Sequence, residues 1–512
     1  MDLPIKIGID EYCRADSKLL MAYEDEVLYI GFSPDGENPG RRCAARISAL
    51  EDGAPVPYTC EILEGKVLLH AEKGHACFAV GKAEELVITG RSIGLAISNG
   101  KALNTFMGGG NAVTDARGGA LFAIAGVRMR FLPRKGTAVP DSHWDFNYLC
   151  DPDPKLYLLP DADGTLETAV FAAEREESAE DRGLTADQAA EDLTRDFAEY
   201  AGALGIDTDR RTAARAAWAL WNCRQPPRPA YELGLEIKPA VIRGRRSSGS
   251  LFAEDYALSA LAEKDTQVAM RLMLLPFAAI QPDGFLPSEL ANHKLRFTAT
   301  PPLYGVVLAS RKDIMEMAGD KEYELLKRAL MWWINRRYCD RHDLFFCEHR
   351  TENGRPEPVP FLGLVPVMTP DLNAYLVLWL RKMTALADKL GRSPDADAWR
   401  NRERLVLEGM RKHLLLEEGY RCLNIAGTGT EGPHSGSFLA EAVASDGAMP
   451  DGLEELRRGR AYAAEYLALY GGTSFGRRLA ETVLAEAEDR PIPDLRCAVT
   501  CLLADRALTE GR

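Results

Sequence analysis

The sequence lacks several features that mark specialised classes of protein. None of its 11 cysteines forms a CxxC pair, no His/Cys cluster has zinc-site spacing, and no run of about 18 apolar residues occurs. It also lacks a basic surplus, because the formal net charge is -14. We therefore expect neither a metal centre nor a membrane span, and we do not expect nucleic acid or an anionic membrane to be the main partner.

The first residues, MDLPIKIGIDEYC, do not show a basic segment followed by an apolar one, which is the pattern of a secretory signal. An odd number of cysteines cannot pair fully within one chain, and unpaired thiols fit a reducing compartment. These two observations predict a cytoplasmic protein.

What the sequence does contain is an average globular composition, with 46% hydrophobic and 27% charged residues in 512. That composition favours a chain that is folded over most of its length. The length is too great for one ordinary hydrophobic core, so at least two domains are expected.

The hydrophobic pattern changes along the chain. Residues 1–172 contain short strand-like runs such as ELVITG and KLYLLP, bounded by Gly, Pro, Asp and Asn, which predicts an antiparallel β-sandwich domain. Residues 173–207 are rich in Ala, Glu and Asp and predict a helical linker, with Thr185 and Asp187 as cap positions. Residues 208–512 show the period of amphipathic helices, so the fold class is multidomain β + α.

One helix of the second half begins with two carboxylates. In GSLFAEDYALSALAEKD, Gly249–Asp265, Glu254 and Asp255 precede a small apolar helix. The ordinary explanation is that the helix dipole and the free amide groups of a first turn favour acidic residues. The segments that follow give a second explanation.

Four downstream segments carry a family resemblance in their order and spacing: QPDGFLPSEL (281–290), TATPPLYGVVLASR (298–311), DLFFCEHRTENG (343–354) and TPDLNAYLVLWLRKMTALADKLG (369–391). Together with the Asp255 helix they resemble the trehalase-like clan of inverting (α/α)6-barrel glycoside hydrolases. The nearest match is glycoside hydrolase family 63 with its bacterial relatives. The resemblance covers roughly residues 210–420 and implies that residues 208–512 form an (α/α)6 helical barrel.

The resemblance also implies roles for individual residues. Asp255 stands where the family has its general acid, and Glu254 replaces the usual tryptophan beside it. Glu352 and Asn353 stand where the family has a carboxylate and a serine that line the sugar site. The residues expected to contact the sugar are Glu254, Asp283, Tyr304, His349, Glu352 and Asn353.

Inverting hydrolysis needs one protonated carboxyl group and one ionised carboxylate that activates water. A helix N-terminus favours the ionised form, so burial or a neighbouring carboxylate must keep Asp255 protonated. In the family, the general base lies near the end of the sequence, on a segment just before the final helix. There LAEAEDRPIPDLRCAV offers Glu486, Glu488 and Asp489, for which a solvated surface role is an equal alternative. Glu431 is a further candidate, for which an exposed loop position is the stronger interpretation.

The leading hypothesis is a glycoside hydrolase, an inverting exo-acting α-glycosidase acting on α-linked gluco- or manno-oligosaccharides. No cofactor is implied, and a homo-oligomer is possible. One alternative is a sugar phosphorylase, in which phosphate replaces the base and the RGRR segment at Arg243–Arg246 contributes positive charge. Another alternative is a carbohydrate-binding protein whose barrel has lost catalysis.

Overall fold

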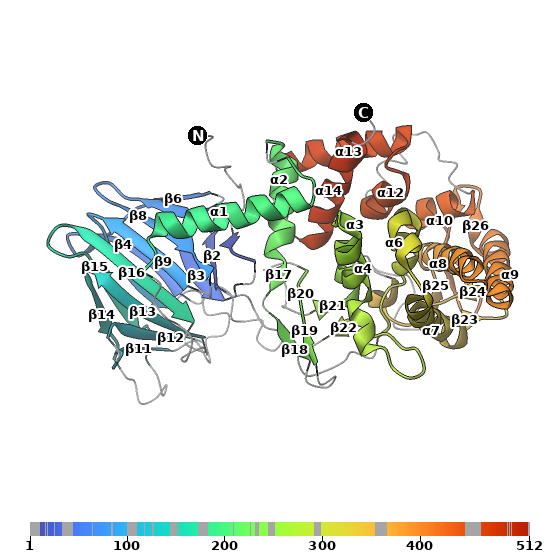
Figure 1. Ribbon diagram of the computed structural model, residues 1–512, viewed down its shortest axis with the longest axis horizontal. Helices are drawn as coiled ribbons and strands as arrows, with labels where there is room; N and C mark the ends of the chain where they lie inside the picture. Colours follow the sequence, from blue (N-terminus) through green and yellow to red (C-terminus); the bar gives the residue numbers. More distant parts are fainter. Residues whose placement is uncertain are drawn as a thin grey trace.

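The structure is a computed structural model that describes part of the chain. The described ranges are 11–32 without 16, 18 and 25, 45–99 without 64, 83 and 84, 110–143 without 117, 125 and 126, 151–172 without 152, 183–243 without 208, 226 and 231–234, 251–290, 298–353, 366–445, and 462–509 without 489, 491 and 493. The sheets lie at one end of the molecule and most of the helices at the other (Figure 1).

The N-terminal part forms two large antiparallel sheets. The first has the order β1 (Glu11–Cys13), β2 (Leu19–Glu24), β3 (Val27–Phe32), β4 (Ala45–Glu51), β10 (Gly94–Asn99), β15 (Lys155–Leu159) and β14 (Thr137–Asp141), and β5 (Ala54–Val56) pairs with β4. The second has the order β11 (Gly110–Thr114), β12 (Ala120–Ile124), β13 (Val127–Lys135), β16 (Thr165–Ala172), β9 (Glu85–Arg91), β8 (His75–Val80), β7 (Val67–His70) and β6 (Thr59–Ile62).

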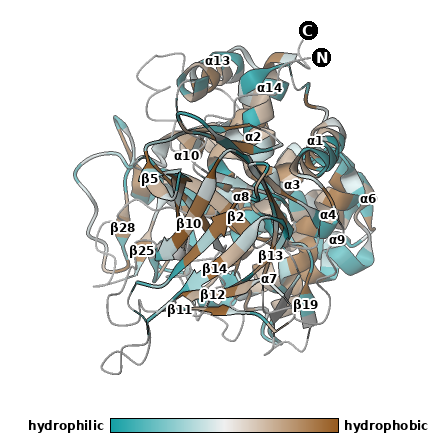
Figure 2. Ribbon diagram, turned by 90° about the vertical axis from the view of Figure 1, so that its left-hand side faces the viewer, coloured by the Kyte–Doolittle hydropathy of each residue, from teal (hydrophilic) through white to brown (hydrophobic). Residues whose placement is uncertain are grey.

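Local sequence signals explain these strands. Along β12, Ala120, Phe122 and Ile124 are buried while the residues between them are half-buried, which is the alternation of a strand with one face on a core. The turn between β4 and β5 is Asp52-Gly53, and both residues have positive φ, as a tight two-residue hairpin requires. Brown, hydrophobic segments are visible on strands such as β10 and β2 (Figure 2), and both sheets contribute to one buried hydrophobic cluster.

Helix α1 (Ala186–Ala203) leads from the sheets toward the helical part (Figure 1). Thr185 caps it in a reciprocal capping box with Gln188, so the predicted cap at Thr185 is confirmed. Its first turns bury Ala186, Ala189 and Ala190 against β8 and β9. Farther along, Phe197 packs edge-on against Trp218 with ring centroids 5.0 Å apart, which joins α1 to the next helix.

The rest of the described chain is helical, with short connecting strands. The helices are α2 (Arg211–Asn222), α3 (Ala253–Ala262), α4 (Thr266–Leu274), α5 (Tyr304–Ser310), α6 (Lys312–Met317), α7 (Asp320–Arg336), α8 (Pro370–Lys389), α9 (Ser393–Gly409), α10 (Ser437–Ala444), α12 (Ala463–Tyr470), α13 (Ser474–Glu488) and α14 (Leu495–Thr509), with the short turns η5 (Leu275–Ala279), η6 (Arg350–Asn353) and η7 (Met410–Leu414). The connecting strands are β17 (Arg224–Gln225), β18 (Arg228–Ala230), β19 (Leu235–Ile237), β20 (Ala240–Val241), β21 (Leu251–Phe252), β22 (Glu289–Leu290), β23 (Tyr338–Cys339), β24 (Leu344–Phe345), β25 (Val367–Met368), β26 (Leu415–Leu416), β27 (Gly419–Tyr420) and β28 (Leu423–Asn424).

Burial separates the helices into two kinds. Helix α3 is buried along its whole length, and α8 is buried from Pro370 to Leu380, whereas α4, α7, α9 and α13 each keep an exposed face. Among the buried helices, α3 packs on α5 and α14, α5 on α8 and α12, α8 on α10, and α12 on α14. The helices with an exposed face pack outside them, as α4 does on α3, α9 on α8 and α13 on α14.

Candidate functional site

The two carboxylates singled out in the sequence lie in the first turn of α3. Strand β21 pairs with β22 immediately before this helix, and the N–H of Ala253 donates to the carbonyl of Ser288. These contacts fix the point at which the helix starts. Glu254 is 8% exposed and Asp255 only 1%, so both carboxylates project into the interior rather than into solvent.

Arg243 is in contact with both carboxylates of this pair. Its guanidinium forms an ion pair with Glu254, and its Nη2 lies 3.4 Å from Oδ1 of Asp255. The guanidinium also stacks on the ring of Phe252 at 4.4 Å from the centroid. The other oxygen of Asp255, Oδ2, is buried and has no hydrogen-bond partner. A buried oxygen of this kind would form a hydrogen bond with a hydroxyl group of a ligand or with a water molecule.

Burial raises the pKa of Asp255 above its usual range. Arg243 and Arg496 act in the opposite direction, and Asp494 adds to the increase, but burial is the largest effect. Burial therefore acts on Asp255 in the direction that a general acid requires. A carboxyl group of this kind retains its proton at a pH where an exposed aspartate has lost it.

A second buried carboxylate, Glu465, is 0% exposed and lies in the first turn of α12. Its Oε1 accepts a hydrogen bond from Arg496 Nη1 at 2.7 Å and another from the Tyr375 hydroxyl at 3.0 Å. Sequence reasoning missed this residue. The available signal was a single acid in the otherwise uncharged stretch AYAAEYLALY.

Asp371 is a third fully buried acid, in the first turn of α8. It accepts a hydrogen bond from the Tyr462 hydroxyl at 2.6 Å. Gly436 approaches so closely that a Cβ there would lie 2.7 Å from the Cβ of Asp371 and 2.9 Å from the Tyr462 hydroxyl. Acidic residues at the N-terminal ends of α3, α8 and α12 thus all face the interior.

Glu352 and Asn353 are buried in η6 at 1% and 0% exposure, as residues lining an internal site would be. Glu352 accepts hydrogen bonds from Arg337 at 3.1 Å, from the N–H of Glu348 at 2.8 Å and from that of Ala299 at 3.3 Å. Its carboxylate therefore holds the loop before α5 against the loop after β24.

The remaining predicted sugar contacts differ in exposure. Tyr304 is fully buried between Phe277 and Trp379, at ring distances of 4.9 and 5.4 Å, and burial raises its pKa. Asp283 is exposed and stabilises its own turn by accepting a hydrogen bond from the Phe285 N–H at 3.1 Å. His349 is also exposed.

Two of the predicted bases lie at the end of α13, where Glu488 is exposed and Glu486 is half-buried, and Asp489 lies outside the described residues. Arg215 donates to the carbonyls of Ala487 at 3.1 Å and Glu488 at 2.8 Å, which anchors this helix end to α2. Glu431 is exposed in its loop. Of the RGRR segment only Arg243 is described, and residues 244–246 lie outside the described part.

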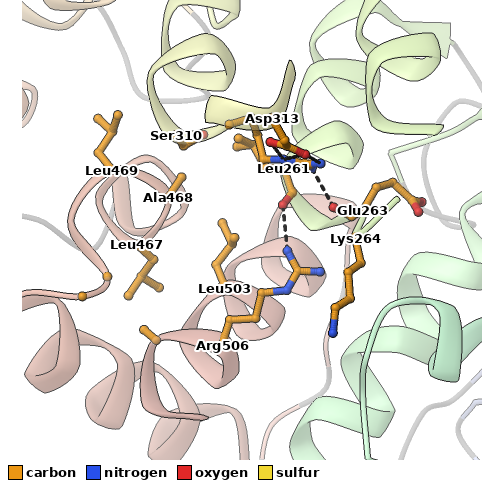
Figure 3. A pocket seen from close by; sticks show the side chains of 14 residues that line it. Leu261, Glu263, Lys264, Ser310, Asp313, Leu467, Ala468, Leu469, Leu503 and Arg506 are labelled. Carbon is orange, nitrogen blue, oxygen red and sulfur yellow. Dashed lines mark hydrogen bonds and ion pairs between the residues drawn. The ribbon is translucent and has the colours of Figure 1, made fainter. Parts of the chain in front are cut away.

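A hollow of about 410 Å³ lies at the C-terminal ends of buried helices, opposite to the first turns that carry the acidic residues (Figure 3). It is lined by the C-terminal ends of α3, α5, α12 and α14. Arg311 donates to the carbonyl of Ala260 at 2.8 Å, and Arg506 donates to that of Leu261 at 3.1 Å. Cations at helix C-termini satisfy terminal carbonyls and complement the dipole. Because Asp255 is at the other end of α3, this hollow is separate from the carboxylate site.

Comparison with solved structures places the fold. A bacterial glucoamylase in complex with acarbose superimposes over 100% of this chain and 96% of its own, with a TM-score of 0.62 and 9% identity. The chain shares its fold with glycoside hydrolases. A family 92 inverting mannosidase from Bacteroides thetaiotaomicron covers 98% of this chain and 82% of its own, with a TM-score of 0.50 and 11% identity.

A family 63 mannosylglycerate hydrolase from Thermus thermophilus in complex with glucose also matches, over 57% of this chain and 99% of its own, with a TM-score of 0.43 and 15% identity. The predicted resemblance to glycoside hydrolases is confirmed at the level of fold by the glucoamylase and the family 92 mannosidase. No protein-family model and no curated protein matches the sequence.

Among the described residues, no group of three or more His, Cys, Asp or Glu side chains is arranged to hold a metal ion. In the same part of the chain, no helix has the length and apolar character needed to cross a membrane.

Proposed function

We propose that this protein is a glycoside hydrolase, an inverting exo-acting α-glycosidase that acts on α-linked gluco- or manno-oligosaccharides. One observation carries the proposal. A buried aspartate with a raised pKa and one oxygen without a partner begins a buried helix, in a fold shared with glycoside hydrolases.

The proposed architecture is a β-sandwich (1–172), a helical linker (173–207) and an (α/α)6 barrel (208–512). Support for the sandwich comes from the hydrophobic cluster to which both sheets contribute. Support for the barrel comes from the two kinds of helix, with α3, α5, α8, α10, α12 and α14 on the inside. We further propose a cytoplasmic location, the compartment that an odd number of cysteines favours.

Asp255 is the proposed general acid. Around it, Glu254 is paired with Arg243 and Glu465 with Arg496, so these four charges cancel in pairs. Asp255 has the weaker contact to Arg243, at 3.4 Å, and Asp494 is a further acid near it, so its neutral form is the one that its buried position favours. A neutral carboxyl group can give its proton to the oxygen of the departing sugar.

The sugar contacts predicted from the sequence are proposed in two groups. Tyr304, Glu352 and Asn353 are buried, and in this proposal they shape the inner end of the site. Asp283 and His349 are exposed, and in this proposal they form the outer rim of the sugar site. Glu486 and Glu488 stay predictions for the general base.

The test is release of reducing sugar from α-linked glucose and mannose disaccharides, with and without phosphate, by the wild type and by Asp255→Asn. We expect phosphate-independent release that the substitution lowers by at least about 10²-fold, the contribution of a general acid. Asp320→Asn, which changes an exposed first-turn aspartate of α7, is the matched control and keeps full activity.

Two other results would replace the proposal. Release that requires phosphate would indicate a sugar phosphorylase, for which the half-exposed Arg243 guanidinium beside Asp255 offers an anion contact. If no disaccharide is cleaved but one binds in calorimetry, the protein is a carbohydrate-binding protein without catalysis.

A further inference from the structure

A hydrolase that inverts needs a second carboxylate, and the structure offers one that the sequence did not indicate. Asp255, Glu465 and Arg496 lie in the first turns of α3, α12 and α14. Helix α14 packs against both of the others. Arg496 binds Glu465 directly and also acts electrostatically on Asp255, so the first turns of these three helices lie close together.

The surroundings of the two carboxylates differ in a way that suits two different roles. Glu465 accepts hydrogen bonds from a guanidinium and a hydroxyl, and charge-assisted bonds of this kind stabilise a carboxylate in its ionised form. Asp255 has only the longer 3.4 Å contacts to Arg243. A pair of carboxyl groups whose surroundings favour opposite protonation states is the arrangement that acid–base catalysis requires.

Glu465 is also better shielded than the acids at the end of α13. It is 0% exposed, whereas Glu488 is exposed to solvent. A base that activates a single water must act where bulk water does not compete with that water.

We infer that Glu465 is the general base of the reaction, held in position by Arg496 and Tyr375, an assignment that rests on the proposed glycosidase function. Glu465 takes a proton from a water molecule whose oxygen bonds to the anomeric carbon. The bond from that carbon to the leaving oxygen breaks, and the leaving oxygen receives the proton of Asp255. The products are a sugar of inverted configuration and an alcohol, and one proton passes through solvent from Glu465 back to Asp255.

The experiment uses α-glucosyl fluoride and α-mannosyl fluoride as substrates. Fluoride is a good leaving group and does not need a proton from a general acid. Asp255→Asn therefore keeps fluoride release although it loses disaccharide cleavage. Glu465→Gln is expected to lose both by about 10³-fold, within the range for a general base. Glu481→Gln, an exposed position on α13, is the matched control and retains the wild-type rate.

Replacing Glu465 also removes the carboxylate that pairs with Arg496, so activity could be lost because the fold is disturbed. A purely structural role for Glu465 therefore needs a separate test. In Glu465→Ala, azide should restore fluoride release and yield a glycosyl azide of inverted configuration, which a merely structural residue would not permit. If the single variants fold poorly, Glu465→Gln combined with Arg496→Gln removes both charges, and this variant should be folded and inactive.

The outcomes separate the two proposals. A folded Glu465→Gln variant or double variant that releases fluoride at the wild-type rate overturns the assignment of Glu465. Azide rescue in Glu488→Ala or Glu486→Ala but not in Glu465→Ala also overturns it and returns the role to the end of α13. A wild type that acts on neither fluorides nor disaccharides refutes the glycosidase function, and the assignment falls with it.

Discussion

The contact between α5 and α8 gives a sharp test of the packing around the site. Gly305 is the second residue of α5, and a Cβ at this position would lie 2.5 Å from the backbone nitrogen of Trp379 and 2.6 Å from the carbonyl oxygen of Tyr375. Both of these atoms belong to the backbone of α8. They cannot rotate away as the end of a flexible side chain can.

The cost of Gly305→Ala follows from these distances. Non-bonded heavy atoms usually approach no closer than about 3.5 Å, so the helices must separate by roughly 1 Å. Overpacking of this kind costs about 1–3 kcal/mol. The better helix propensity of alanine offsets at most about 1 kcal/mol of that cost. We expect a net loss of about 1–2 kcal/mol, which lowers the melting temperature by about 2–4 °C per kcal/mol for a domain of this size.

The assay compares thermal and urea unfolding of Gly305→Ala with that of Gly202→Ala. Gly202 lies inside α1, and no atom stands within 4 Å of a Cβ built there. The alanine at 202 should therefore stabilise the protein by about 0.5–1 kcal/mol. If Gly305→Ala is as stable as the wild type, or if both variants are destabilised alike, the close approach of α5 to α8 is refuted.

Three further substitutions test the buried carboxylates. The raised pKa of Asp255 means that the wild type loses stability as the pH rises through that pKa. The stability of Asp255→Asn relative to the wild type should therefore increase as the pH rises above the usual pKa range of an aspartate, and a difference that does not change with pH in urea unfolding would contradict this sign. Glu352→Gln should destabilise by about 1–3 kcal/mol, because Arg337 loses its buried partner Glu352 but keeps Glu348 at 2.9 Å, whereas unchanged urea unfolding would show that the buried pair contributes no stability. Tyr462→Phe should cost about 1.5–3 kcal/mol because Asp371 loses a hydrogen bond, and calorimetry showing less than about 0.5 kcal/mol would refute it.

Much of the fold was predictable because its signals are local. The Asp52-Gly53 turn and the alternation along β12 depend only on neighbouring residues. The helix with its cap at Thr185 was likewise predictable from a few consecutive residues. The pairing order of the strands was not predictable, because β9 pairs with β16 across more than 70 residues of chain.

The candidate site was predictable only in part. Asp255 was found because its motif and the segments after it keep a recognisable order, and the structure buries it. The expectation that its base lies among Glu486 and Glu488 stays a prediction. Glu465 was missed because the one signal in its segment, a single acid in an otherwise uncharged stretch, does not show which groups from other helices lie beside it.

The sequence by itself determined the change from strands to helices, the turns and caps, and the position of Asp255 in a first helical turn, since these depend on short-range periodicity and residue preference. Only the tertiary structure decided that Asp255 is buried and that Arg496 pairs with Glu465 from a helix 31 residues away. The protonation state of a carboxyl group depends on burial and on charges brought close by the fold, and neither can be read from its neighbours in the chain.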